Sequence, residues 1–157
     1  MKEAIGNSFL VTLAITLMSL VMVILVASFV YSKTYKVKNR IINIMEKRAE
    51  YTSEGEGNVK DEIYQALAQM GYRVNSSTRR CPSIDIPDPT SGTENNVKLL
   101  HDTNFGSYDF CLYEIRTSRG YYYHVITYTH YDVPIIGETL NFTIKGDTRT
   151  IYEEVGG

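Results

Sequence analysis

The chain has 157 residues and a formal net charge of −2, with 13 Tyr, no Trp and two Cys. This length leaves room for one small domain after the long apolar opening segment is set aside. The near-neutral charge removes the electrostatic basis for binding nucleic acid, so we expect no nucleic-acid partner.

The opening segment predicts a membrane-spanning helix. No charged residue occurs between Glu3 and Lys33, an uncharged run of about 29 residues, whereas about 20 suffice to span a bilayer as a helix. We therefore assign residues 1–8 as a short N-terminal leader or flank and residues 9–32 as a single transmembrane helix whose partner is the lipid bilayer. The alternative is a cleaved secretory signal with "VAS" at 26–28 as its cleavage site, but the run exceeds the roughly 7–15 apolar residues of such a signal.

Helical character continues through residues 33–52 as an amphipathic extension. Apolar and Thr positions recur there at steps of three and four, while basic residues occupy the other faces. The recurring positions are Val30, Thr34, Val37, Ile41, Ile44 and Met45. No Gly or Pro intervenes before Gly55, so we expect one continuous helix of about 45 residues, roughly 65 Å long. The stripe needs a cover, either the C-terminal domain of the chain, which we favour, or lipid headgroups.

Two features give opposite predictions for the side of the membrane on which residues 53–157 lie. Four basic residues follow the span, and the positive-inside rule alone would place the domain in the cytoplasm. They are Lys33, Lys36, Lys38 and Arg40. Cys81 and Cys111, in contrast, are an even pair in a small domain, which often indicates a disulfide and an oxidising compartment, although two free buried thiols are the alternative. We predict the disulfide and an extracytoplasmic α+β domain at the cell membrane.

Residues 53–157 begin with a second predicted helix. The turn-rich segment 52–58 separates it from the long helix, and Asn58 is a suitable N-cap. Gly71 suits the position after the last turn, so the helix is expected over residues 59–70. The segment 76–96 contains three Pro and is expected to form an irregular loop that the disulfide attaches to the sheet.

The remainder predicts an antiparallel meander. Strands are expected over 108–116, 121–133 and 139–145, with a turn at 117–120 and a short fourth strand over 148–154. A small antiparallel sheet must bury one face, and the amphipathic half of the long helix is the available cover. The expected fold class is therefore α+β, with a long N-terminal transmembrane and amphipathic helix packed on a small C-terminal antiparallel sheet.

No residue pattern in the chain predicts catalysis. His124 and His130 share a strand face but would lie about 20 Å apart, too far to bind one metal, so they are interpreted as polar-face residues. Asp85 and Asp88 match no calcium-ligand spacing, and His101 has no partner motif. We predict neither an enzyme nor a cofactor or metal site.

The order of these features resembles the type IV pilin and pseudopilin plan, in particular the minor pilins of tight-adherence (Tad) pili. The resemblance rests on the apolar helix after "MKEAIG", its basic continuation "YSKTYKVKNRIINIMEKRAEY", the cysteine pair and the terminal meander. It implies leader cleavage at Gly6 and helix–helix contacts with other pilin-like subunits. The implied assembly residues are Phe9, Leu13, Leu17, Leu20 and Ile24. The family usually has a Glu at the fifth mature position, where this chain has Val11. This departure from the family pattern gives an alternative expectation, a permanently membrane-held accessory subunit.

Two functions follow as hypotheses. The first is a pilin-like subunit or accessory component of a type IV or Tad-like pilus or secretion machine. The alternative is a single-pass anchored surface module that binds an unknown wall polymer, glycan or protein through a Tyr-rich sheet. Its candidate binding residues are Tyr121, Tyr122, Tyr123, Tyr128 and Tyr131.

Overall fold

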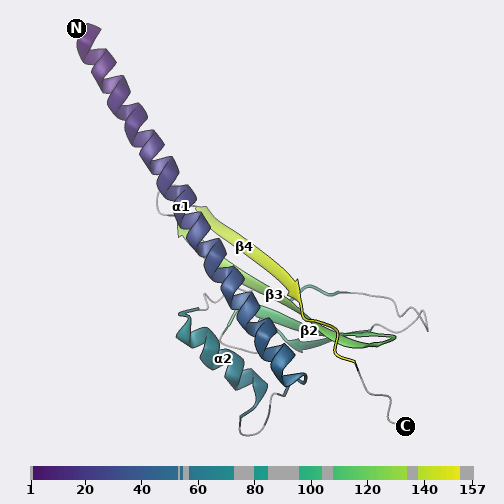
Figure 1. Ribbon diagram of the computed structural model, residues 1–157. Coiled ribbons are helices and arrows are strands. Elements are labelled where there is room, and N and C mark those ends of the chain that lie inside the picture. Colours follow the sequence, from purple (N-terminus) through teal and green to yellow (C-terminus); the bar gives the residue numbers. More distant parts are fainter. Residues whose placement is uncertain are drawn as a thin grey trace, which may run out of the picture.

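The computed structural model describes residues 2–52, 54, 57–72, 80–84, 96–103, 108–133 and 138–152, with the side chains of all but 2–7, 130–133 and 138–141. Within these residues the chain forms two helices and a four-stranded sheet. The elements are α1 (Lys2–Arg48), α2 (Val59–Gln69), β1 (Val97–His101), β2 (Phe110–Thr117), β3 (Gly120–Val133) and β4 (Glu138–Asp147). One half of α1 projects away from the rest of the molecule and the other half lies along the sheet beside α2 (Figure 1). The predicted α+β class is confirmed.

Helix α1 is continuous over 47 residues, as its uninterrupted apolar pattern predicts. It ends at Arg48, before the predicted boundary at residue 52. Ala49 takes a φ of 59°, in the left-handed region that commonly closes a helix, and its N–H donates to the carbonyl of Met45 at 2.8 Å. No Gly marks this end in the sequence, so the stop depends on contacts with the sheet that are described below.

The sheet is an antiparallel meander in the order β1-β2-β3-β4. Strands β2 and β3 are joined by the predicted turn, where Thr117 pairs with Gly120. Strand β4 pairs with β3 from Val133 opposite Glu138 to His124 opposite Asp147. The predicted hairpins are therefore confirmed, with small changes in the strand ends.

Two parts of the strand prediction were wrong. Strand β1 was not predicted, because "VKLLH" is short and lacks clear alternation; its conformation depends on pairing with β2, with a register shift between Leu99 and His101. In the described part of the predicted strand over 148–154, residues 148–152, there is a single bridge between Ile151 and Tyr121. Most of the predicted loop over 76–96 lies outside the described residues.

One face of the sheet, the inner face, is covered by the second half of α1 together with α2. Side chains from both helices and from β2 and β3 form one buried cluster, which includes Val37, Ile41, Met45, Ile63, Leu67, Phe110, Leu112, Tyr123 and Val125. Helix α2 begins as predicted, because the Asn58 side chain accepts a hydrogen bond from the Asp61 N–H at 2.7 Å. The apolar stripe of α1 is thus covered by the chain's own domain rather than left for lipid headgroups.

A glycine in β4 allows α1 to approach the sheet closely. A Cβ placed on Gly146 would lie 2.7 Å from Cδ of Lys38 and 3.1 Å from Cδ1 of Ile42, both on α1. The missing side chain therefore leaves the space that these two helix residues occupy.

Candidate functional site

The first half of α1 presents apolar side chains to the exterior on all its sides. Exposure reaches 66% for Phe9 and 75% for Met18, and the stretch beginning at Ser8 is long and apolar enough to cross a membrane. The predicted assembly residues Phe9, Leu13, Leu17, Leu20 and Ile24 are all exposed. Their spacing of three and four residues places them on one helical face, so this face is open to lipid or to another helix.

Three hydroxyl groups within the apolar half donate hydrogen bonds inside the helix. Thr12 donates to the Ser8 carbonyl at 2.9 Å, Thr16 to the Thr12 carbonyl at 2.8 Å, and Ser19 to the Ile15 carbonyl at 2.6 Å. Such bonds remove the cost of placing a free hydroxyl in hydrocarbon. These three polar residues are therefore compatible with a membrane span.

The domain begins where the exposed apolar run ends. Among the described side chains of α1, which start at Ser8, Thr34 is the first fully buried one, and its hydroxyl lies 2.6 Å from that of Thr129 on β3. One residue earlier, the Lys33 ammonium donates to the Gly71 carbonyl, beyond the end of α2, at 2.8 Å. The two contacts attach the domain directly to the helix, without a linker between the apolar half and the sheet.

The tyrosines of β3 do not form one binding surface. Tyr121 and Tyr123 face α1, where their hydroxyls donate to the Ala49 carbonyl at 2.7 and 3.1 Å. Tyr122 points to the opposite, outer face, and Tyr128, also on that face, is buried. The side chain of Tyr131 lies outside the described residues. Consecutive strand residues alternate between faces, so the predicted surface is corrected to Tyr122 alone among the described candidates.

The two inward tyrosines terminate α1. Burial is the main cause that raises the pKa of Tyr123, and Tyr121 and Glu114 add to it, so the hydroxyl remains a neutral donor. A helix leaves its last carbonyls without intrahelical partners, and the Ala49 carbonyl receives two donors from the sheet instead. The contact therefore links the end of the long helix to β3.

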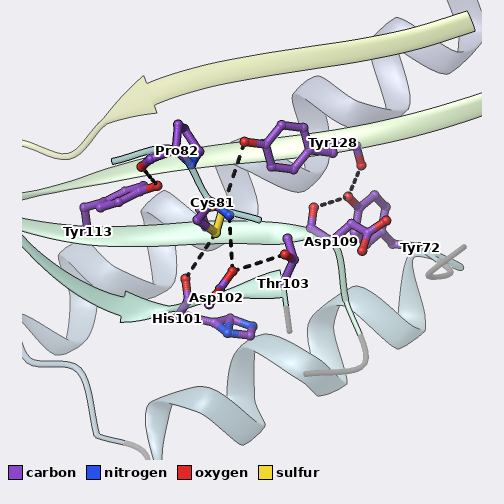
Figure 2. Close-up of a disulfide and its surroundings, with 10 residues drawn as sticks. Tyr72, Cys81, Pro82, His101, Asp102, Thr103, Asp109, Tyr113 and Tyr128 are labelled. Atoms are coloured by element: carbon purple, nitrogen blue, oxygen red, sulfur yellow. Dashed lines mark hydrogen bonds between the residues drawn. A yellow bond between two sulfur atoms is a disulfide. The ribbon is translucent and has the colours of Figure 1, made fainter. Parts of the chain in front are cut away.

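A disulfide covers the outer face of the sheet. The predicted bond between Cys81 and Cys111 is present, with a Cα–Cα distance of 5.8 Å. The Cys81 N–H donates to Asp102 Oδ1 at 3.3 Å, and the Tyr113 hydroxyl donates to the Pro82 carbonyl at 2.6 Å (Figure 2). Residues 81–84 therefore lie against β2, and Cys81 and Ile84 pack on the outer cluster. This cluster consists of Cys111, Tyr113, Ile115, Ile126 and Tyr128.

The histidines occupy separate environments. His101 is buried, with its ring centroid 4.0 Å from that of Phe110 and its Nε2 3.3 Å from the Tyr64 hydroxyl. Burial, assisted by Lys60 and opposed by Asp102, lowers the pKa of His101 to about 4, so its ring is neutral near pH 7.

On the outer face, His124 is hydrogen-bonded through Nδ1 to Asp147. This placement matches the polar-face prediction for His124, whereas the side chain of His130 lies outside the described residues. Over the described part of the chain, no three His, Cys, Asp or Glu side chains are grouped closely enough to hold a metal ion.

The comparisons with known proteins identify no relative. No protein-family model, curated protein or solved structure matches this chain. The features that bear on function are the division of α1 into an exposed half and a packed half, and the attachment of the sheet to the packed half.

Proposed function

We propose that the chain is a pilin-like, membrane-anchored subunit or accessory component of a type IV or Tad-like pilus or secretion machine. The observation that carries the proposal is the division of α1. Its first half is apolar on every side and exposed, and its second half is buried against the sheet of the same chain. A helix that is apolar on all sides is stable in lipid or among similar helices, so one segment can be held in the membrane and also pack in an assembly.

The attachment of the domain supports an assembly function over a simple anchor. An anchor requires only a span and tolerates a flexible connection. Here the Thr34–Thr129 contact fixes the start of the packed half, and Tyr121 and Tyr123 fix its end at Ala49. Because the helix and sheet are joined at both places, contacts between the apolar halves of neighbouring copies would also orient their domains.

The same features support a single-pass position in the cell membrane with the domain outside the cytoplasm. The exposed apolar run from Phe9 to Tyr31 corresponds to about 33 Å of helix, close to the roughly 30 Å of a bilayer core. The Cys81–Cys111 disulfide is characteristic of an oxidising compartment. These observations favour the extracytoplasmic side despite the basic residues that follow the span.

Photocrosslinking in membranes tests the assembly. A photoreactive phenylalanine analogue at Leu17 samples the proposed assembly face, and the same analogue at Ile15, which is also exposed, samples a different face of the helix. We expect crosslinked dimers and larger species mainly from Leu17. Monomers alone from both positions would contradict the assembly function.

Mass spectrometry of the membrane-extracted chain separates the two versions of the proposal. A mature chain that starts after Gly6 supports a processed filament subunit. An intact Met1 supports the accessory version, in which the chain stays in the membrane, and this version agrees with Val11 in place of the usual Glu.

The outer face favours a second candidate, an anchored surface-binding module. Tyr122 is half-buried there, and the His124–Asp147 pair lies on the same side of the sheet. A ring beside a hydrogen-bonding pair suits recognition of a polar ligand such as a glycan. Photocrosslinks from an analogue at Tyr122 to a cell-wall component, together with monomers from Leu17, would favour this function.

A further inference from the structure

Three exposed cations lie on one face of α1 where its apolar half ends. Lys33, Lys36 and Arg40 are all exposed and follow one another at steps of three and four residues. This spacing places them on the same side of the helix. We name these three residues the basic collar.

Acidic side chains do not neutralise the basic collar from its own helix. The sequence contains no Asp or Glu between Glu3 and Glu46. Among the residues that the structure describes, Lys36 and Arg40 take part in no ion pair, and the hydrogen bond of Lys33 goes to a neutral carbonyl.

The neighbouring helix brings its acids to the opposite end. Asp61 and Glu62 lie in the first turn of α2, and Glu62 pairs with Arg48 at 2.9 Å. Lys33 instead contacts Gly71, beyond the last turn of α2. The acids of α2 therefore lie near the end of α1, away from the collar.

Two tyrosines lie at the same level as the collar. Tyr31 and Tyr35 are 52% and 46% exposed and, four residues apart, share a helical face. Exposed Tyr rings next to an apolar span are typical of the headgroup level of a bilayer. Lys38, in contrast, is turned into the domain, with its Nζ 4.3 Å from the centre of the Tyr35 ring.

We propose that the basic collar binds the phosphates of anionic phospholipids in the leaflet next to the domain and holds the domain at a fixed height above it. The inference depends on the membrane anchoring in the proposed function. Lys33 to Arg40 covers about 10 Å of helix axis, comparable to the Debye length in physiological salt. Lys47 is a further 10 Å or so along the axis and lies beyond the reach of the headgroups.

Fluorescence quenching by brominated lipids tests this inference, because the chain contains no Trp of its own. A Phe29→Trp variant of the full chain is reconstituted in phosphatidylcholine vesicles that contain phosphatidylglycerol, because Phe29 is 73% exposed and lies four and seven residues before Lys33 and Lys36, on the side of the collar. The bromines are carried, in separate samples, by one lipid or the other, near the headgroup end of the acyl chains. We expect at least about threefold enrichment of phosphatidylglycerol around the introduced indole, which 1 M salt should largely abolish.

Matched variants locate the binding site. The double change Lys36→Gln with Arg40→Gln should bring the enrichment close to one. Lys47→Gln is the control, because it also removes a positive charge at an exposed position of α1, and it should leave the enrichment unchanged. If the collar is unmodified and the two lipids quench the indole only in proportion to their mole fractions, the inference is overturned and the anchor is left in place. Absence of quenching by either lipid would show that the introduced indole is not at a membrane, which overturns both the anchor and the inference.

Discussion

The two halves of α1 share one helical backbone but have different partners. Residues 8–31 are apolar on every side and none of their large side chains is buried, whereas Val37, Ile41 and Met45 form one stripe and are fully buried. The number of apolar faces makes the difference. A single stripe can be covered by one sheet, whereas residues 8–31 expose apolar side chains on every side, more than the described part of the domain covers.

The largest expected effect on stability comes from replacing an isoleucine in the packed half of α1, compared with an isoleucine in the apolar half. Ile41→Ala should lower the free energy of unfolding of the domain by about 2–5 kcal/mol, because Ile41 is 0% exposed and its loss leaves a cavity. Ile15→Ala, at a side chain that is 62% exposed, should change it by less than about 0.5 kcal/mol. Urea unfolding in detergent micelles, followed by circular dichroism, measures both. Equal losses of unfolding free energy in the two variants would show that both halves of α1 contribute equally to the stability of the domain.

Removing the disulfide tests how much residues 81–84, which cover the outer face of the sheet, contribute to the stability of the domain, for comparison with the helices that cover the inner face. Replacing Cys81 with Ser and Cys111 with Ala should cost the domain about 2–4 kcal/mol, because the bond closes a loop between residues 30 apart. Reductant should bring the native chain to a similar stability and leave the variant unchanged. Retention of α1 in alkali-washed membranes should be the same for both chains, and its loss would contradict an anchor that is independent of the domain.

Acid should act on the domain and spare residues 8–31 of α1, which contain no Asp, Glu or His. The folded-state pKa of His101 is lowered from 6.5 to about 4, so the unfolded chain takes up the proton first as pH falls. The associated stability is fully present above pH 6.5 and is lost as pH falls towards 4, by about 3 kcal/mol in total.

Urea unfolding at about pH 7 and about pH 4.5, on either side of most of this change, measures the loss. His101→Asn should flatten the dependence on pH even if the variant is less stable at neutral pH. A steep dependence that persists in His101→Asn would assign the effect to another group.

The smallest expected effect concerns the end of the packed half. Changing both Tyr121 and Tyr123 to Phe removes the two donors to the Ala49 carbonyl and should cost about 1–2 kcal/mol. Either single change should cost less, because one donor remains. Tyr122→Phe, on the outer face, is the control and should stay within about 0.5 kcal/mol. Thermal unfolding of the four variants gives the comparison, and equal effects of the double change and of Tyr122→Phe would contradict the helix-ending contact.

Several features were predictable because their cause is local in the sequence. The uncharged run to Lys33 and the absence of Gly and Pro beyond it predicted one long helix, and Asn58 predicted the start of α2. The turn at 117–120 predicted the hairpin of β2 and β3. Periodicity, capping and turn chemistry each act over a few residues, so a single sequence displays them.

Other features required contacts between distant segments. Strand β1 exists because it pairs with β2, and α1 ends at Ala49 where two tyrosines of β3 meet its carbonyl. The burial of His101 likewise depends on α2 and β2. The local composition of the sequence does not distinguish buried residues from exposed neighbours in these segments. For this reason the predicted Tyr-rich surface combined tyrosines from opposite faces of the sheet.

The sequence by itself determined that the chain has a membrane-length helix, an amphipathic continuation and an antiparallel meander, because hydrophobic periodicity encodes each of them. Only the tertiary structure decided what the continuation packs on, which tyrosines remain outside and how closely α1 approaches Gly146. Those outcomes depend on the fit of side chains that are far apart in the chain, and the fit exists only after the helix and the sheet have come together.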